Sequence, residues 1–294
     1  MRILLIGAKG LLGQTLANVL KTEDLAAVDR DVIDITDKIA LQKFCREVNP
    51  EIIINAAAYN AVDEVEKNDE AAKQAFMINA EAVGYLAEAS IDHKALLIHF
   101  STDYVFDGIK GSPYVEDDPP KPISAYGRSK YEGEQVILKN GRRGLKYYLI
   151  RTSRLFGKSS GAGKKTFVDI VLGAASQKDE LQFINDEIAS PTFVADLAAA
   201  VKELLVSQPA LGIFHRTNDG SCSWYEFAKA VLNESDVYAA DHAILDRKYI
   251  NVRPITGKDL PRPARRPAYS VLKSTKLPPL RHWREALKEY LNSR

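Results

Sequence analysis

The first half of the chain alternates short apolar runs with longer stretches in which apolar residues recur every three or four positions. The short runs, which predict buried strands, span residues 2–6, 25–28, 52–54, 95–100 and 146–150. The stretches between them predict helices over residues 11–20, 37–48 and 69–90, and from about residue 123. Uninterrupted apolar strands separated by helices are typical of a parallel sheet covered on both faces. Residues 1–152 are therefore predicted to form a doubly wound α/β domain.

The regular alternation weakens in the second half of the chain. Helical spacing recurs at residues 167–175, 194–206 and 283–291, while residues 159–163 are predicted to be flexible and the basic, proline-rich residues 253–267 to cross a surface as a loop. We therefore predict that residues 153–294 mainly form a smaller α/β lobe that binds substrate. Part of it, residues 193–216, is expected to return to the first sheet.

Composition excludes several classes of function. The 294 residues are 46% hydrophobic and 27% charged, which suits a globular protein with a full core. A net charge of +1 gives no field for nucleic acid or an anionic membrane. No apolar run reaches the roughly 18 residues of a membrane span, so a cytoplasmic protein is expected. Cys45 and Cys222 lack partners at ligand spacing and are predicted to be packing residues.

Three glycines, Gly7, Gly10 and Gly13, lie between the first predicted strand and the first predicted helix. The first glycine permits a tight turn, and the others permit close approach of a pyrophosphate and of helix to strand. The first helical residues, Leu11 and Leu12, would offer backbone N–H groups and a favourable dipole to a phosphate. This spacing predicts a Rossmann site for an NAD(P) cofactor in residues 1–152.

The residues after the second strand bear on the choice between NADH and NADPH. Asp29 is expected to bind the ribose diol and to discourage a 2′-phosphate. Arg30 and Lys9 favour the opposite preference, because either cation could accept that phosphate; all three could also be merely solvated. Either cofactor therefore fits the sequence. The other positions expected to line the cofactor are Asp34 and Ile35 beside the adenine, and Ala56, Ala57 and Ala58 at the end of the third strand.

Tyr126 and Lys130 are the predicted catalytic pair. Residues four apart on a helix share a face, and an ammonium favours the phenolate of a tyrosine whose ordinary pKa is about 10. Thr102, at the end of the fourth strand, would hold the substrate oxygen beside Tyr126, and Asp103 would bind a substrate hydroxyl. As isolated residues, the pair would be an ordinary surface contact, and Thr102 and Asp103 would be loop caps.

Together these motifs resemble the dTDP-4-dehydrorhamnose reductase family of extended short-chain dehydrogenases/reductases. The resemblance implies reduction of the 4-keto group of dTDP-4-dehydro-L-rhamnose by NADPH or NADH. A related dehydratase would have Thr-Asp-Glu where this chain has Tyr104 as the third residue, so dehydration is disfavoured. The matching strings are Asn55-Ala-Ala-Ala-Tyr-Asn-Ala-Val-Asp63, Ser101-Thr-Asp-Tyr-Val-Phe-Asp-Gly108, Tyr126-Gly-Arg-Ser-Lys130, Arg151-Thr-Ser153, Ala189-Ser-Pro-Thr192, Ser223-Trp-Tyr-Glu-Phe-Ala228 and Arg265-Arg-Pro267.

The chain departs from that family in the expected sugar site. It has Arg154 where the family usually has tryptophan, and Lys165-Thr166 where paired asparagines are usual. Arg154 could meet a diphosphate or point to solvent. Arg266, next to Arg265, is expected to bind the nucleotide diphosphate, with a structural salt bridge as the alternative.

Other interpretations remain open. Relatives of this fold serve as NADP-binding regulatory subunits of methionine adenosyltransferase, and others are reductases or epimerases of different nucleotide sugars. Some relatives bind a divalent cation at a dimer interface, but the matching positions are Thr15 and Ala195, so no metal is predicted. The five histidines, His99 among them, fit no ligand or triad spacing and are expected to have core or surface roles. A monomer or homodimer is expected.

Overall fold

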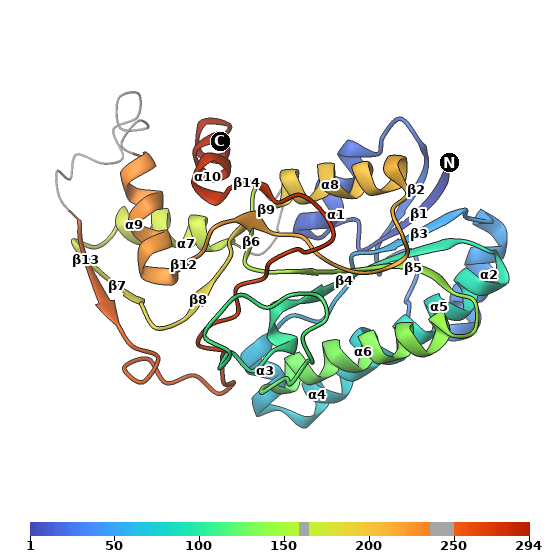
Figure 1. The fold of residues 1–294 in the computed structure, drawn as a ribbon, viewed down its shortest axis with the longest axis horizontal. Helices are drawn as coiled ribbons and strands as arrows, with labels where there is room; N and C mark the ends of the chain where they lie inside the picture. Colours follow the sequence, from blue (N-terminus) through green and yellow to red (C-terminus); the bar gives the residue numbers. More distant parts are fainter. Residues whose placement is uncertain (159–164, 236–249) are drawn as a thin grey trace.

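A computed structural model describes residues 1–158, 165–235 and 250–294 as two lobes joined side by side (Figure 1). The segment 159–163, predicted to be flexible, lies outside the described residues. Among the residues described, no helix combines the length and apolar character that crossing a membrane requires. The same residues contain no group of three or more His, Cys, Asp or Glu placed to hold a metal ion.

The larger lobe is built on a six-stranded sheet in which all neighbouring strands are parallel. The predicted doubly wound sheet is therefore confirmed. From β1 the chain adds β2 on one side, and it then adds β3, β4 and β5 on the other side. The strand order therefore switches between β1 and β3, and ligands of such sheets collect beyond the carboxyl ends of the strands at that point. In spatial order the strands are β10 (Gly212–His215), β5 (Lys146–Thr152), β4 (Leu96–Thr102), β3 (Ile52–Asn55), β1 (Arg2–Ile6) and β2 (Asp24–Val28).

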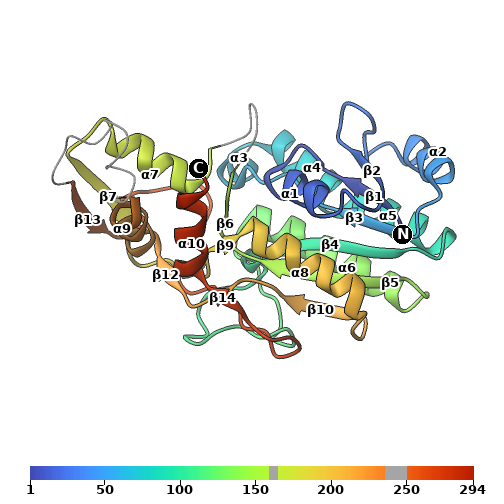
Figure 2. The same ribbon diagram turned by 90° about the horizontal axis from the view of Figure 1, so that it is seen from above.

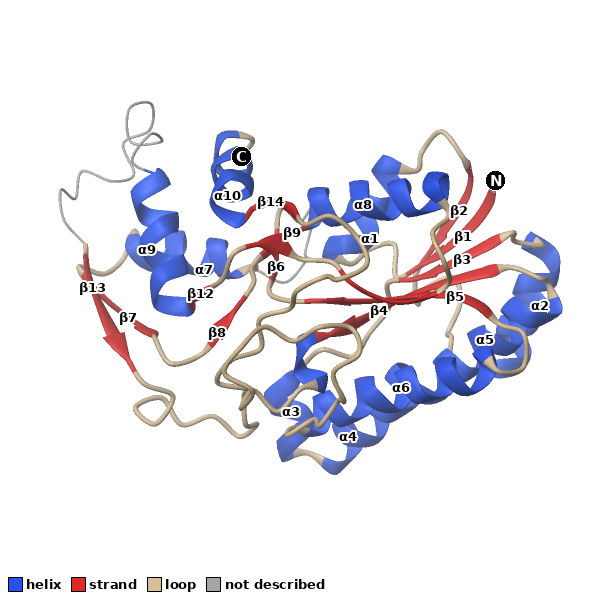
Figure 3. Cartoon of the chain, in the orientation of Figure 1, coloured by secondary structure: helices blue, strands red, loops and turns tan. Residues whose placement is uncertain are grey.

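Helices cover both faces of this sheet (Figures 2 and 3). Because side chains alternate along a strand, Ile52 and Ile54 of β3 enter the core beneath α1 and α8, whereas Ile53 enters the core beneath α2 and α5. α8 packs on α1, and β10 pairs with β5, so this part of the second half of the chain lies in the larger lobe. The helices are α1 (Leu11–Val19), α2 (Lys38–Val48), α5 (Ala82–Asp92), α6 (Ala125–Gly141) and α8 (Val194–Ser207).

The helix predicted over residues 69–90 is interrupted. It consists of α4 (Asp69–Phe76), a π-helical turn (Met77–Glu81) and α5, and the short helix α3 (Val62–Lys67) precedes it. Asn79 in the π turn accepts a hydrogen bond from the Tyr59 N–H and donates one to the Tyr59 carbonyl. A Cβ added at Gly133 of α6 would lie 2.1 Å from the Asn79 carbonyl oxygen. The π turn thus lies where α6 and the segment after β3 both pack against the α4–α5 helix. These are tertiary contacts, so the spacing of apolar residues along the sequence could not predict the turn.

The smaller lobe packs aromatic side chains between α9, α10 and short strand pairs. Phe156, Phe193, Phe227, Trp283 and Tyr290 form the centre of its core. The surface loop predicted over residues 253–267 is wrong at its start, because β13 pairs in parallel with β7, and such a long-range pairing leaves no local signal. The elements are α7 (Phe167–Ala175), α9 (Trp224–Ser235), α10 (Trp283–Asn292), β6 (Leu155–Phe156), β7 (Glu180–Ile184), β8 (Ile188–Ala189), β9 (Thr192–Phe193), β11 (Asn218–Asp219), β12 (Cys222–Ser223), β13 (Asn251–Ile255) and β14 (Leu280–His282).

Candidate active site

The glycine turn between β1 and α1 brings backbone against backbone. Gly7 has φ +80°, and a Cβ there would lie 2.6 Å from the Ala57 nitrogen. A Cβ at Gly13 would lie 2.0 Å from the Gly7 carbonyl oxygen. α1 starts after Gly10 with no side-chain cap and no acidic residue in its first turn. The N–H groups of Leu11, Leu12 and Gly13 therefore form a helix end suited to an anion, and the turn fits a dinucleotide pyrophosphate.

Gly13→Ala is expected to weaken NAD(P)H binding by at least about tenfold, because the added methyl must push the turn and α1 apart. A fluorescence titration with NADPH measures the loss. Gly173→Ala in α7 is the matched control, since nothing lies within 4 Å of a Cβ there. Equal NADPH affinity in the two variants would contradict the assignment of the turn to the cofactor.

The charged residues after β2 are paired with one another. The Asp29 carboxylate accepts the backbone N–H groups of Lys9 and Arg30, each at 2.8 Å, and so ties β2 to the glycine turn. The Lys9 ammonium lies 2.7 Å from Asp31, and Arg30 Nε lies 3.8 Å from Asp34. Both cations are exposed. Of the other predicted residues, Ile35 is buried in the core, and Ala56, Ala57 and Ala58 follow β3 beside Gly7.

Thr102 and Tyr126 meet at the carboxyl end of β4. Tyr126 lies in the first turn of α6, which Ser124 caps by accepting the Gly127 N–H. The Tyr126 ring is edge-on to Tyr104, with 5.9 Å between centroids. Burial and the nearby Asp103 raise the pKa of Tyr126, and a hydrogen bond with Thr102 lowers it by less. The phenol therefore remains protonated and can donate a proton.

Lys130 lies one turn further along α6 and is buried. Its Nζ donates to the Phe100 carbonyl oxygen at 2.7 Å and lies 3.4 Å from His99 Nε2. Burial lowers the pKa of Lys130 to about 8, and the Glu134 carboxylate opposes that shift. The amine is thus directed at the main chain of β4, below the edge at which Thr102 and Tyr126 meet.

Asp103 is buried and bonded within the protein. One carboxylate oxygen accepts the Thr102 hydroxyl at 3.0 Å, and the other accepts the Ser270 hydroxyl at 2.5 Å. Burial raises the pKa of Asp103. Ser270 lies between β13 and β14, in residues 256–279, which we call the C-terminal segment. Asp103 therefore links that segment to the end of β4.

Arg154 does not point to solvent, so that alternative is wrong. Its guanidinium donates to the carbonyl oxygens of Cys222 and Glu187, both at 2.8 Å, and lies 4.0 Å above the Trp224 ring. The two carbonyl oxygens and the face of the Trp224 ring hold the planar guanidinium inside the protein. Arg154 therefore joins the ends of β8 and β12 in the smaller lobe.

Arg266 forms a two-bond salt bridge with Asp63, at 2.7 and 2.6 Å, and lowers the pKa of that carboxyl. The structural salt bridge considered above is thus present. Arg265 is exposed. In the second departure from the family pattern, Lys165 is exposed, whereas Thr166 caps α7 in a mutual arrangement with Asp169.

Several residues around the site were missed from sequence. Asn79 donates to the Ser129 hydroxyl, which in turn donates to the Tyr126 carbonyl oxygen, so the π turn braces the first turn of α6. Asn55 contacts His99, and Glu134 contacts Arg151. Asn55, His99 and Arg151 could have been noticed in the sequence as polar residues near the ends of apolar strands.

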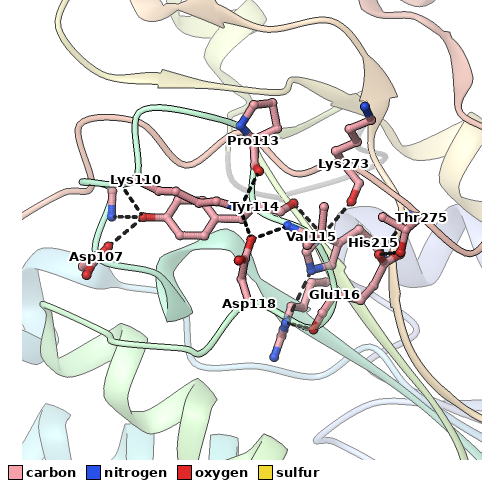
Figure 4. A network of polar contacts seen from close by, with 12 residues as sticks. Asp107, Lys110, Pro113, Tyr114, Val115, Glu116, Asp118, His215, Lys273 and Thr275 are labelled. Atoms are coloured by element: carbon pink, nitrogen blue, oxygen red, sulfur yellow. Dashed lines mark hydrogen bonds and ion pairs between the residues drawn. The ribbon is translucent and has the colours of Figure 1, made fainter.

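A buried polar network fastens the segment that follows Asp103 (Figure 4). The Glu116 carboxylate accepts hydrogen bonds from the His215 N–H and from the N–H and hydroxyl of Thr275. His215 Nδ1 faces the carbonyl oxygens of Tyr114 and Lys273, so it must carry the proton. Burial lowers the pKa of His215 to about 4. We call this network the Glu116 clasp. It joins the segment between Asp103 and α6, which contains Glu116, to β10 and to the C-terminal segment.

The whole chain resembles known proteins. A family model described as the RmlD substrate binding domain matches residues 1–294. A probable dTDP-4,6-dihydroxy-2-methyloxan-3-one 4-ketoreductase of Streptomyces antibioticus is 39% identical, over 98% of this chain and 94% of its own. A dTDP-4-dehydrorhamnose reductase of Aggregatibacter actinomycetemcomitans is 36% identical, over 94% and 92%. The crystal structure of dTDP-4-dehydrorhamnose reductase from Bacillus anthracis in complex with NADP has a TM-score of 0.89 at 33% identity, covering 100% of this chain and 99% of its own.

Proposed function

Because this chain belongs to the dTDP-4-dehydrorhamnose reductase family, we propose that it reduces the C4 keto group of dTDP-4-dehydro-L-rhamnose to dTDP-L-rhamnose with NADPH or NADH. The observation that carries this proposal is the meeting of Thr102 and Tyr126 at the carboxyl end of β4, in the sheet whose strand β1 leads into the glycine turn. Two hydroxyls at that edge suit a carbonyl oxygen that becomes an alkoxide.

Each catalytic residue has a separate task. The nicotinamide, when bound, supplies the hydride. Tyr126 donates its phenolic proton to the C4 oxygen. Thr102 would orient that oxygen by redirecting to it the hydroxyl proton that it donates to Asp103. Lys130 holds the nicotinamide ribose, and in its charged form it stabilises the tyrosinate that proton transfer leaves behind. The glycine turn and the start of α1 would hold the pyrophosphate, and Asp29 and Arg30 would bind the adenosine part of the cofactor.

The substrate is proposed to lie between the lobes. Asp103, next to Thr102, would accept a sugar hydroxyl in addition to the Thr102 and Ser270 hydroxyls that it already binds, and Arg154 and Arg266 would attract the diphosphate. Both guanidinium groups already have protein partners, so they would act mainly through charge.

Dehydration is disfavoured by the residue after Asp103. A dehydratase needs a base there, but burial raises the pKa of Tyr104 to about 12, so its phenol stays protonated near neutral pH and cannot act as that base. A regulatory subunit would need no proton donor, and the retained Thr102 and Tyr126 favour the enzyme. Copurification with methionine adenosyltransferase and no turnover would favour the regulatory subunit.

We expect dTDP-4-dehydro-L-rhamnose to be reduced in preference to other keto sugars. The test is NADPH and NADH oxidation, followed at 340 nm, with a panel of dTDP-, UDP- and GDP-linked 4-keto sugars, with light scattering to distinguish a monomer from a homodimer. A preference for another dTDP sugar would change the substrate and preserve the reductase. Absence of turnover with the whole panel would contradict the proposed function.

A further inference from the structure

Three buried polar side chains from three elements form a chain that ends at Lys130. Asn55 Nδ2 at the end of β3 lies 3.1 Å from His99 Nδ1 in β4, and His99 Nε2 lies 3.4 Å from Lys130 Nζ in α6. The exposed fractions of Asn55, His99 and Lys130 are 0%, 1% and 2%. Because water has almost no access, their protons must be arranged among themselves and the neighbouring main chain.

The main chain decides how these protons are arranged. Asn55 Oδ1 accepts the backbone N–H of Ala57 at 3.1 Å, and a backbone N–H can only donate. The NH2 end of the Asn55 amide therefore faces His99, so Nδ1 of the imidazole must accept. Burial, with the Lys130 charge beside it, holds the pKa of His99 well below its ordinary value. His99 is therefore neutral and carries its single ring proton on Nε2, the atom that faces Lys130.

A donor directed at an amine favours its uncharged form. An ammonium has three N–H groups and no lone pair, whereas a neutral amine can accept the His99 Nε2–H while donating to the Phe100 carbonyl oxygen. The other ionisable groups near Lys130 counter this only in part. The Glu134 carboxylate favours the charged amine but is held by Arg151 of β5, and Tyr126, at the start of α6, is protonated.

We propose that Asn55 and His99 are positioning residues that set the charge of Lys130, with Asn55 fixing the His99 tautomer and His99 donating its Nε2–H to the amine. The consequence for turnover rests on the proposed function, in which only the charged lysine stabilises the tyrosinate. The Lys130 charge is present below its pKa of about 8 and is lost as the pH rises through that value.

The His99 tautomer is measured directly by long-range ¹H–¹⁵N correlation on full-length protein labelled at histidine, with no nucleotide or sugar added. His99 should show the Nε2–H pattern and His215 the Nδ1–H pattern, so the second residue is an internal reference. The His99 signals are identified by their loss in His99→Leu, or in His99→Gln if the leucine variant does not fold. An Nδ1–H pattern for His99 overturns the proposal.

Asn55→Asp tests the effect on Lys130. A carboxylate still accepts the Ala57 N–H but can only accept from His99, so the imidazole proton moves from Nε2 to Nδ1 and is donated to the carboxylate. Nε2 then becomes an acceptor that favours the Lys130 ammonium. The Lys130 titration midpoint, followed by the Cε resonance of ¹³C-lysine and assigned with Lys130→Met, should rise by at least about one pH unit. An unchanged midpoint overturns the proposal.

His99→Leu separates the tautomer from the added charge of Asn55→Asp. This variant removes the Nε2–H donor without introducing a carboxylate, and the Lys130 midpoint should again rise. His93→Leu is the control, because His93 pairs with Asn49 at the surface. This variant should leave the titration midpoint of Lys130 unchanged. A fall in the His99→Leu midpoint overturns the proposal. Since neither NMR experiment uses the sugar, failure of the proposed substrate leaves both results interpretable.

Discussion

Tyr126→Phe is expected to lower kcat for the keto sugar by at least about 100-fold while leaving the Kd for NADPH nearly unchanged. General acid catalysis typically contributes a factor of about 100 to 10,000, and the variant removes the only proton that Tyr126 can donate. The ring and its edge-on contact with Tyr104 are retained, so the first turn of α6 should keep its geometry. Stopped-flow kinetics and a fluorescence titration with NADPH measure the two quantities.

A neighbouring tyrosine provides the matched control. Tyr131 lies on α6 but packs against the cluster of Val105, Phe106 and Tyr114. Tyr131→Phe should therefore reduce kcat only slightly. If the two variants lose activity equally, helix geometry rather than proton donation explains the loss, and the assignment of Tyr126 as the acid fails.

Glu134→Leu is expected to lower the free energy of unfolding by about 3–5 kcal/mol, because it leaves the Arg151 guanidinium buried without its counter-charge. Arg151 binds both carboxylate oxygens, at 2.9 and 2.7 Å, and the two side chains are 2% and 0% exposed. Urea denaturation followed by circular dichroism measures the loss.

The double variant Glu134→Leu with Arg151→Met distinguishes an unpaired charge from poor packing. Removing both charges should recover much of the stability lost in the single variant. Glu47→Gln breaks an exposed pair with Lys43 and should change stability very little. A double variant no more stable than Glu134→Leu would show that the destabilisation comes from lost packing.

Local patterns in the sequence predicted the parts of the molecule that depend on local spacing. Apolar runs identified the central strands, and a separation of four residues placed Tyr126 and Lys130 on one helix. Thr102 was identified because it ends an apolar strand. These features need only the repeat of a helix or strand and the rule that ligands collect at strand ends.

Features that depend on contacts between distant residues were not predicted. His99 was expected only to have a core or surface role, because only the packing of α6 on β4 brings Lys130 to its ring. Arg154 was expected to meet the substrate or solvent, because its two carbonyl acceptors, Cys222 and Glu187, are distant in sequence and no local pattern predicts them. The π turn at Asn79 likewise arises from tertiary contacts. All three features depend on tertiary packing, which the spacing of residues along the sequence does not reveal.

The Glu116 clasp has a consequence for biosynthesis. Its carboxylate binds His215 and Thr275, which lie 99 and 159 residues further along the chain. Glu116 leaves the ribosome long before either partner has been synthesised, so its carboxylate stays in water until residues 215 and 275 emerge. Strands β1 to β5 can pair during translation, but the clasp closes only after residues 215 and 275 have left the exit tunnel.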